Sequence, residues 1–416
     1  MDFYDKVRAV WRAAAVSGIG IVSPFGSTQQ SFVDNLLQGR SAIAPLTGFD
    51  TSDCRSTLAA QTSTFQPTDW VTPMRLRRLE RTALYATAVA RLAFDDAGRE
   101  PLPDGDDAAG IVLGTWTAGG QQSEIYLDAF FKGGPQMAPG LLFESTVGNA
   151  PASFAALEHK LRGPNATISQ NEASGIVAIA SAVEMLRLGR ATQLLAGAVD
   201  VIFETFYRAW DRCKVMSTAR AFSRNVAPFD RERNGFVLGE GGVGLWLERA
   251  SPDAPLPAAQ HGWIIGAAEA STAVRINEWP TSPTTLASTM SAALEDAGLT
   301  PADVHVAYAS ANAAPELDAV EAEALSQLFG GSTTVITSIK GAVGEAGFSS
   351  AASCAAAFLC GRIGQVPPIA GLVEPDPATA RLKLARTVTP APGPIALVNG
   401  VGRGGTLCSL VLQVRT

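Results

Sequence analysis

Three glycine-rich turns of this sequence have the composition from which proteins build small-molecule sites. They are Asn171–Gly175, which stands at a strand-to-helix junction, Lys340–Gly347 and Asn399–Thr406. The third could cradle a phosphate, but the spacing G-x-x-x-x-G-K-[ST] is absent, and so is the spaced acid of a dinucleotide site. Glycine-rich turns without those partners are typical of tight backbone packing. The turns therefore favour close packing over a nucleotide site.

Imidazole and thiol groups are scarce in the chain, which has three His and five Cys. No C-x-x-C pair occurs and the number of Cys is odd, which argues against a disulfide framework or a zinc site and fits a reducing cytoplasm. The plainest interpretation of Cys213, Cys354 and Cys360 is that they are small buried apolar groups. The remaining residues of these two types are Cys54, Cys408, His159, His261 and His305.

The elements that position these turns alternate along the chain. Strand-like apolar runs such as Ala14–Val22 are followed by Ala-rich helical stretches such as Leu76–Ala97, whose small apolar residues share one face. Gly175–Leu188 reads as a buried helix that is apolar nearly all round. A Pro-rich connection at Ser251–Pro257 precedes a second half with the same alternation. The pattern predicts an α/β fold with covered sheets, and two similar halves.

Composition narrows the class of protein. The 416 residues are 47% hydrophobic and 17% charged, with a formal net charge of −7, so the chain can bury a large core. Nucleic-acid binding is disfavoured, because it needs clustered Lys and Arg. The N-terminus carries acids and lacks a long apolar segment, and no apolar run reaches the ~20 residues of a membrane span. We expect a cytoplasmic protein without a signal peptide or a membrane partner.

Several motifs, in the right order, resemble the β-ketoacyl synthases. The first looks like the family's opening strand, the second matches the strand that enters its active-site elbow, the third resembles its long internal signature, and the last resembles its Gly-Phe-Gly-Gly-Thr turn. In this sequence they are Val16–Gly26, Leu161–Ser169, Pro228–Gly241 and Gly402–Thr406.

The resemblance runs from about Ala14 to Leu412, essentially the whole chain. It implies a thiolase-type, five-layered αβαβα fold built from two ketosynthase-like halves, which we expect at residues 1–250 and 251–416. It also implies an obligate dimer.

The sequence departs from the family at its catalytic positions. Glu172 stands in the elbow Thr167–Gly175 where the resemblance places the nucleophilic Cys. Ser310 and Glu345 stand where it places two His, and the three histidines of the chain fall at none of these sites. Only the family's lysine is retained, as Lys340.

These replacements change the chemistry that the site can perform. Condensation needs a thiolate that holds the acyl chain as a thioester and donors that stabilise developing negative charge. A carboxylate is a poor acyl acceptor, so we expect no independent condensing activity. Glu172 should lie at the N-terminus of a helix over Ala173–Leu188, whose dipole and free N–H groups favour an anion. We hypothesise that it forms an ion pair with Lys340, in a purely structural or a functional role.

A synthase-like subunit without the Cys resembles the chain-length factor, or β-ketosynthase subunit, of type II polyketide synthases. That resemblance implies a heterodimer with a catalytic ketosynthase, an acyl chain carried on the phosphopantetheine of a partner acyl carrier protein, and no other cofactor. It also implies that the subunit shapes the acyl tunnel, at a helix predicted over Gln122–Phe131. Ser123, Tyr126 and Phe130 share one face of that helix, and Leu142 joins them by motif alignment.

The four residues assigned to the tunnel could instead serve ordinary packing at a subunit interface. Two other functions of the chain also stay open. The chain could be a malonyl-carrier-protein decarboxylase or degenerate ketosynthase that uses Glu172, although Glu lacks the amide donors of the Gln that is common in chain-length factors. It could also be a homodimeric acyl-binding scaffold.

A basic segment could dock an acidic carrier protein or form a solvated helix face. Its residues are Arg75, Arg77, Arg78 and Arg81.

Overall fold

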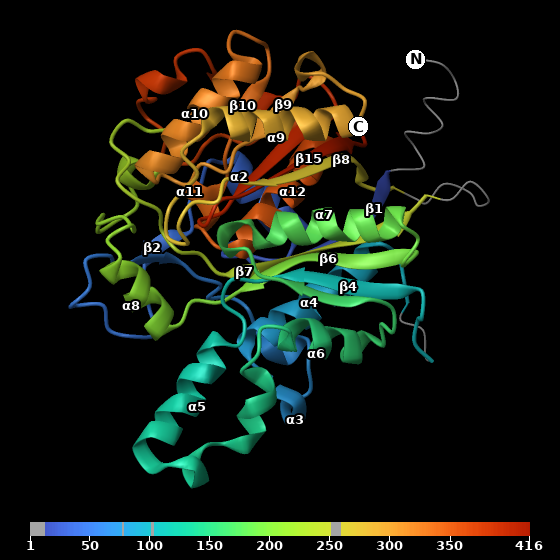
Figure 1. Ribbon diagram of the computed structural model, residues 1–416, viewed down its shortest axis with the longest axis vertical. Helices are drawn as coiled ribbons and strands as arrows, with labels where there is room; N and C mark the ends of the chain where they lie inside the picture. Colours follow the sequence, from blue (N-terminus) through green and yellow to red (C-terminus); the bar gives the residue numbers. More distant parts are fainter. Residues whose placement is uncertain (1–12, 77–78, 101–103, 251–258) are drawn as a thin grey trace.

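The computed structural model describes residues 13–76, 79–100, 104–250 and 259–416. The predicted Pro-rich connection, the boundary at residue 251, and Arg77 and Arg78 lie at or within segments outside this part of the chain. The element labels below are those of Figure 1.

The N-terminal half builds five strands in the spatial order β5-β4-β6-β7-β1. The strands β5, β4 and β6 are parallel, and β7 runs antiparallel to both β6 and β1. The strands β1, β4, β6 and β7 are almost entirely buried, as expected for a sheet covered on both faces, whereas the edge strand β5 is partly exposed. The five strands are β1 (Ala14–Val22), β4 (Ala109–Gly114), β5 (Asn165–Ile168), β6 (Gln193–Asp200) and β7 (Gly241–Arg249).

The C-terminal half repeats this arrangement as β10-β9-β14-β15-β8. The first three strands are again parallel, and the last two again alternate in direction. The repeat of both strand order and strand direction confirms the prediction of two similar halves. The strands are β8 (Gly262–Ser271), β9 (Val306–Tyr308), β10 (Val335–Thr337), β14 (Ile395–Val401) and β15 (Thr406–Val414), with β12 (Lys383–Leu384) added beside β10. A short pairing of β1 with β8 joins the two halves.

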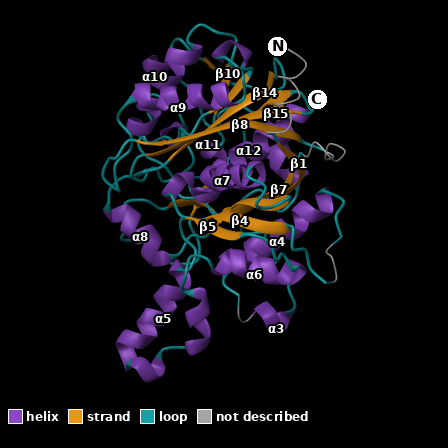
Figure 2. Cartoon of the chain, turned by 45° about the vertical axis from the view of Figure 1, so that its right-hand side comes forward, coloured by secondary structure: helices purple, strands orange, loops and turns teal. Residues whose placement is uncertain are grey.

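Helices complete five layers, which Figures 1 and 2 show edge-on. The helices α7 and α12 lie between the two sets of strands and contact both. The helices α4 and α6 cover the outer face of the N-terminal strands, and α9 and α10 cover that of the C-terminal strands. The six helices are α4 (Arg81–Asp96), α6 (Ala150–His159), α7 (Ser174–Arg187), α9 (Pro283–Asp296), α10 (Pro315–Phe329) and α12 (Gly347–Arg362).

The two central helices approach closely because their contact residues are small. A side chain at Gly175 of α7 would place its Cβ 2.6 Å from the carbonyl oxygen of Gly347 in α12, which is closer than atoms can come. Most of both helices is buried, as predicted from the apolar composition of residues 175–188. The predicted helix over Leu76–Ala97 begins later in the structure, at Arg81.

Smaller elements surround the layers. The shorter helices are α2 (Gln29–Leu37), α3 (Pro73–Leu76), α8 (Glu204–Arg212) and α11 (Lys340–Val343). Two small sheets pair β2 (Ile43–Pro45) with β3 (Leu58–Ala60) and β11 (Gln365–Val366) with β13 (Thr389–Pro390). None of the helices in the described part of the chain is long and apolar enough to cross a membrane.

One segment projects away from the layers in both ribbon views, and we call it the arm. The arm comprises α5 (Gly120–Gly133) and the short 3-10 helices η2 (Pro135–Met137) and η3 (Gly140–Ser145), which pack against α5. Large apolar side chains on and beside it are exposed to an unusual degree, although scattered apolar exposure is ordinary. They are Ile125, Leu127, Phe131, Met137, Leu141, Phe143 and Val147.

Candidate functional site

The elbow that carries Glu172 is a 3-10 turn, η4 (Asn171–Ala173), between β5 and α7. Asn171 adopts a left-handed conformation with φ of 49°, and its side-chain amide donates to the backbone carbonyl of Arg403 at 3.0 Å. This turn places Glu172 directly before α7, as predicted, with none of its surface exposed. One amide at the start of α7 bonds elsewhere, since the N–H of Ile176 donates to Ser350 Oγ.

The partner of Glu172 is Arg403, so the predicted ion pair with Lys340 is wrong. The guanidinium Nη1 of Arg403 donates to Glu172 Oε1, and the backbone N–H of Arg403 donates to Oε2 at 2.9 Å. Arg403 reaches the carboxylate because the turn between β14 and β15 folds over the elbow, and a Cβ at Gly402 would lie 2.8 Å from the carbonyl oxygen of Gln170. Both oxygens of the carboxylate are therefore occupied.

The guanidinium of Arg403 is enclosed by aromatic rings. Its central carbon lies 4.1 Å from the ring centroid of Trp279, 4.7 Å from that of Phe236 and 4.9 Å from that of Trp210. Ring faces attract a cation, and the attraction grows when water is excluded. Arg403 Nε and Nη2 have no hydrogen-bond partner among the described residues. The rings and Glu172 thus take the place of solvent around this charge.

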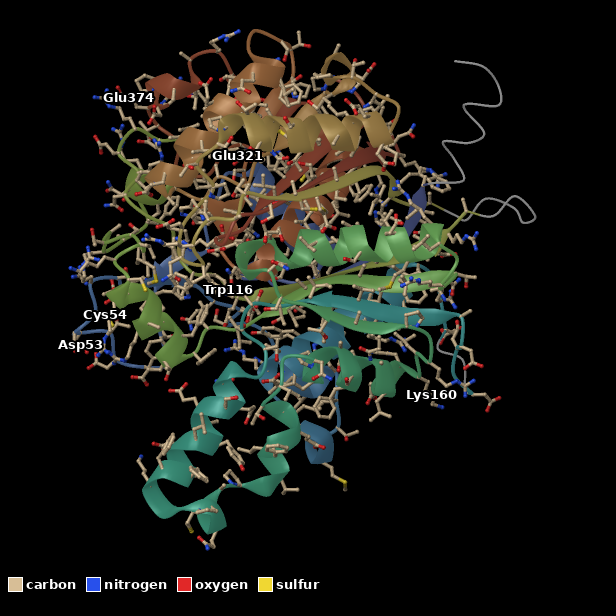
Figure 3. All side chains as sticks on the ribbon, in the orientation of Figure 1. Asp53, Cys54, Trp116, Lys160, Glu321 and Glu374 are labelled. Atoms are coloured by element: carbon tan, nitrogen blue, oxygen red, sulfur yellow. The ribbon has the colours of Figure 1, made fainter. Side chains whose placement is uncertain are left out.

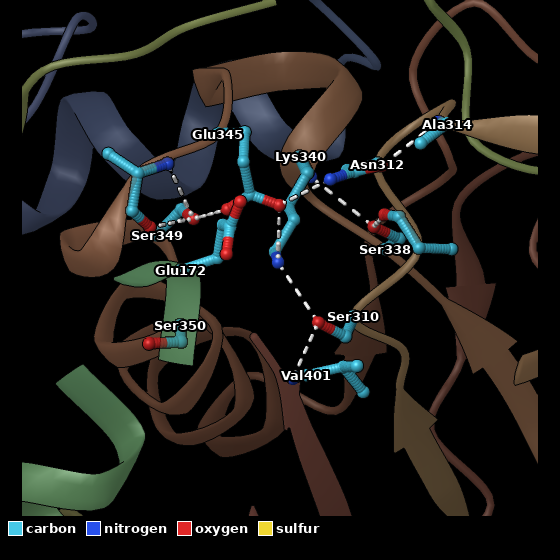
Figure 4. Close-up of polar contacts among 12 residues, drawn as sticks. Glu172, Ser310, Asn312, Ala314, Ser338, Lys340, Glu345, Ser349, Ser350 and Val401 are labelled. Atoms are coloured by element: carbon cyan, nitrogen blue, oxygen red, sulfur yellow. Dashed lines mark hydrogen bonds and ion pairs between the residues drawn. The ribbon is translucent and has the colours of Figure 1, made fainter. Parts of the chain in front are cut away.

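A second buried ion pair joins Lys340 to Glu345, as Figure 4 shows. Lys340 Nζ lies 2.8 Å from Glu345 Oε2, and the side-chain amide of Asn312 donates to the same oxygen at 2.7 Å. Ser349 Oγ donates to Oε1 at 2.7 Å. Burial raises the pKa of Glu345, and the charge of Lys340 opposes that shift.

Ser310 links this pair to a further buried carboxylate. Its Oγ accepts from Lys340 Nζ and from the backbone N–H of Val401, both at 3.0 Å. Its backbone N–H donates to Oε1 of Glu321 at 2.8 Å, and the amide of Asn399 donates to that oxygen at 3.1 Å. Burial raises the pKa of Glu321 to about 7. The four expected positions, Glu172, Ser310, Lys340 and Glu345, therefore lie in one buried region with Glu321.

Several members of this region were not predicted. Glu321 stands with Asp318 three residues apart on α10, and both acids are buried, with Asp318 accepting backbone N–H groups from Asn312 and Ala313. The i, i+3 spacing of two acids beside an apolar stripe was the available signal. The role of Arg403 had a signal as well, because Arg replaces Phe in the Gly402–Thr406 turn.

The histidines and cysteines take no part in the contacts described above. His159 bonds the backbone carbonyl of Thr87, His261 bonds Asp96, and His305 lies beside β14. The prediction that Cys354 and Cys360 are buried is confirmed, and burial raises the pKa of both thiols. The same prediction is wrong for Cys213, which is exposed because it ends α8 at the surface.

The four predicted tunnel residues lie on the arm, all half-buried. The hydroxyl of Ser123 donates to the carbonyl of Thr146 at 3.1 Å. The Tyr126 ring centroid is 5.9 Å from that of Phe143, and that of Phe130 is 5.5 Å from that of Phe131. Leu142 lies in η3, which packs against α5. The arm brings the four onto one structure, and their role in a tunnel stays a prediction.

Of the basic residues considered for carrier docking, Arg81 is held by Glu240. Its Nη2 lies 2.8 Å from Glu240 Oε1, and the carboxylate is fully buried. Arg81 thus anchors the start of α4, and docking by the segment stays a prediction.

Two domain families match the chain, and together they span most of the layered fold. Residues 12–253 match "Beta-ketoacyl synthase, N-terminal domain", and residues 261–372 match "Beta-ketoacyl synthase, C-terminal domain". The chain belongs to the β-ketoacyl synthase family. Within that family it is a member whose elbow carries Glu172 in place of the expected Cys.

The relatives of this β-ketoacyl synthase family chain include proteins of two kinds. It is 29% identical to a 3-oxoacyl-[acyl-carrier-protein] synthase 2 of Rhizobium meliloti, over 97% of this chain and 99% of the relative. It is 30% identical to an oxytetracycline polyketide putative β-ketoacyl synthase 1 of Streptomyces rimosus, over 88% of each chain.

Solved structures share the fold of this family member over its length. The ishigamide ketosynthase/chain length factor superposes with a TM-score of 0.88 at 23% identity, covering 97% of this chain and all of that one. A β-ketoacyl synthase from Burkholderia phymatum gives the same TM-score at 25% identity and the same coverage. These likenesses establish the thiolase-type α/β fold.

Proposed function

We propose that this chain is a non-catalytic chain-length factor, which pairs with a catalytic ketosynthase subunit of a type II polyketide synthase. The observation that carries the proposal is the state of Glu172, which is fully buried and bonded through both oxygens to Arg403. A nucleophile or base must reach its substrate. A carboxylate enclosed in this way supplies neither a nucleophile nor a base.

The rest of the region supports the same conclusion. Glu345 is bound by Lys340, Asn312 and Ser349, so the lysine retained from the family pattern is held by a carboxylate. Neutral imidazole donors at positions 310 and 345 would stabilise an oxyanion, whereas Ser310 and Glu345 are committed to the buried network. The region thus has the character of a stable polar core.

The arm supports pairing with another subunit. Its apolar side chains are much more exposed than a surface in water favours, with Phe131 at 78% and Leu141 at 79%. The strand β5 forms one edge of the sheet, and one of its sides is unpaired among the described residues. An apolar arm and an open strand edge suit a large, stable interface.

On this proposal, the growing acyl chain is carried on the phosphopantetheine of a partner acyl carrier protein. The arm bounds the far end of the tunnel that holds this chain. Tyr126 and Phe130 are the bulky members of the set, and Ser123 and Leu142 complete it. Co-expression with a Cys-containing ketosynthase should give a stable one-to-one complex. In that complex, Tyr126→Ala and Phe130→Ala should lengthen the product. Asp128→Ala, an exposed change on the same helix, is the control. Unchanged product length in both variants would contradict the proposal.

The decarboxylase alternative requires Glu172 to meet a malonyl group. Because Glu172 is fully buried and bound to Arg403, we expect the purified chain to release no carbon dioxide from malonyl-carrier protein. Activity that Glu172→Gln abolishes would replace the proposal with this alternative. A stable homodimer that ignores the ketosynthase would instead favour the acyl-binding scaffold.

A further inference from the structure

A surface cavity is lined in part by Arg403, the residue that binds Glu172 at the elbow. The cavity has a volume of about 380 Å³. Its wall includes Lys214, Asn234, Trp279 and Glu316, together with Arg403 itself. It is large enough to hold a small organic molecule.

Arg403 connects this cavity to Glu172. Glu172 is not among the described residues that line the cavity, and none of its surface is exposed. Arg403 touches both sides, since it lines the cavity and also binds both oxygens of Glu172. A molecule in the cavity therefore meets the arginine before it can meet the elbow.

Three aromatic rings and one carboxylate hold the guanidinium in place. Trp279 belongs to the cavity wall and also stacks on the guanidinium, while Phe236 and Trp210 enclose it from other elements. The carboxylate of Glu172 fixes its tip. Moving the side chain would break a buried ion pair and expose three ring contacts, and such changes are costly.

A series of aromatic contacts runs from Arg403 toward the arm. The rings of Trp210 and Trp116 are 5.1 Å apart between centroids, and those of Trp116 and Phe206 are 5.0 Å apart; Trp116 follows β4 (Figure 3). Phe203 continues the series, with a centroid 5.5 Å from that of Phe206. A Cβ at Gly120, where α5 begins, would lie 2.4 Å from the Phe203 ring. Aromatic side chains thus fill this direction up to the start of the arm.

We propose that the side chain of Arg403 blocks the access of acyl groups and other small-molecule substrates to the elbow. The inference deepens the proposed function and rests on it for the view that the elbow performs no chemistry. It adds that two separate features keep the elbow inactive, the replacement of the nucleophile and the closure of its access. A Glu172→Cys chain loses the ion pair but keeps the three ring contacts that hold the guanidinium. A thiol at position 172 should therefore still remain unreactive while Arg403 is present.

Alkylation of an engineered thiol tests directly whether Arg403 blocks access to the elbow. The exposed Cys213 is first changed to Ser, so that the background comes from the four buried cysteines. Glu172→Cys is then introduced into the full chain and treated with iodoacetamide, with alkylation followed by mass spectrometry. A guanidinium beside the new thiol favours the reactive thiolate, so slow alkylation reports closed access.

The new thiol should react at least ~100-fold more slowly than Cys213 does in the parent chain, because reaction requires local opening. Adding Arg403→Ala should bring the rate to within ~10-fold of that of Cys213. Glu316→Ala, which enlarges the same cavity at its exposed wall, is the matched control and should leave the reaction slow. Arg403→Met keeps apolar packing against the rings and replaces Arg403→Ala if melting curves show that the latter is unfolded.

Rapid alkylation of the Glu172→Cys chain with Arg403 intact would overturn the proposal. Slow alkylation in a folded chain that lacks Arg403 would also overturn it. Because the measurement needs no partner subunit, failure of the chain-length role in the product assay would leave this result standing, and the reverse also holds.

Discussion

Glu172 and Arg403 stand 231 residues apart in the chain and form one buried ion pair between its two halves. Glu172 begins the central helix of the N-terminal half, and Arg403 lies in the turn between the last two strands. Burying two charges costs desolvation energy that their attraction must offset. The pair therefore matters most when one member is lost, because the other then remains buried without a partner.

This asymmetry predicts the outcome of a double-mutant cycle. Glu172→Ala leaves a buried guanidinium and should lower the free energy of unfolding by ~3–5 kcal/mol. Arg403→Ala leaves a buried carboxylate without its cation and should also lower the free energy of unfolding. The double variant should lose less than the sum of the two. Denaturation curves measure all three, and additivity within ~0.5 kcal/mol would show that the pair is not coupled.

The ion pair of Lys340 with Glu345 predicts that a second substitution restores stability lost by the first. Lys340→Met removes the cation beside Glu345, whose pKa burial already raises. The variant should unfold at a lower temperature than the parent at neutral pH, and the difference should shrink in acid as Glu345 takes a proton. Adding Glu345→Gln should restore part of the loss, since Gln accepts hydrogen bonds without a charge. A double variant less stable than Lys340→Met alone would contradict this account.

The raised pKa of Glu321 predicts a pH-dependent stability. The carboxyl has a pKa of about 7 in the folded chain, against ~4.3 for a free Glu, so the folded state binds the extra proton. Burial of the Glu321 side chain therefore costs no stability below the pKa of a free Glu, ~4.3. The cost grows as the pH rises from there to the pKa of the folded chain, about 7, where it is complete. Glu321→Gln should therefore gain melting temperature relative to the parent as pH rises from about 5 to about 8.

The control for this effect is Glu323→Gln, an exposed change on the same helix, α10. Its melting temperature should follow that of the parent across the same pH range. A difference between Glu321→Gln and the parent that is constant with pH would show that Glu321 carries the same charge in the folded and unfolded chains.

Sequence patterns predicted where the polar groups gather but not how they pair. The strand Ala14–Val22, the turn that carries Glu172 and the helix that follows were all predicted from local patterns, because each depends on neighbouring residues. The pairing of Glu172 with Arg403 depends on which of two buried cations reaches the elbow. That choice is made by the turn between β14 and β15, far along the chain.

The aromatic enclosure of Arg403 was unpredictable for a similar reason. Trp210 comes from α8, Phe236 from the signature segment and Trp279 from the loop before α9, so no single stretch of sequence carries the pattern. The exposure of the arm was also missed, since its helix has the apolar content of an ordinary packed helix. Its exposed apolar face becomes visible only when the layers are in place.

The exposed arm gives the last prediction. Phe131→Glu and Leu141→Glu change side chains that are already in water, at 78% and 79% exposure, so neither should lower the melting temperature of the isolated chain measurably. In a partner interface, each new carboxylate would be buried without a counter-ion, and one such charge is costly. Each variant should therefore weaken association by at least ~10-fold, measured by light scattering of co-expressed subunits.

Ile276→Glu is the matched control, because Ile276 is 72% exposed but lies in the loop between β8 and α9, away from the arm. It should leave association unchanged. If all three variants weaken association equally, general surface charge explains the effect, and the arm is not the interface. If only the arm variants do so, the apolar exposure of this segment in the single chain is the unpaired half of a subunit contact.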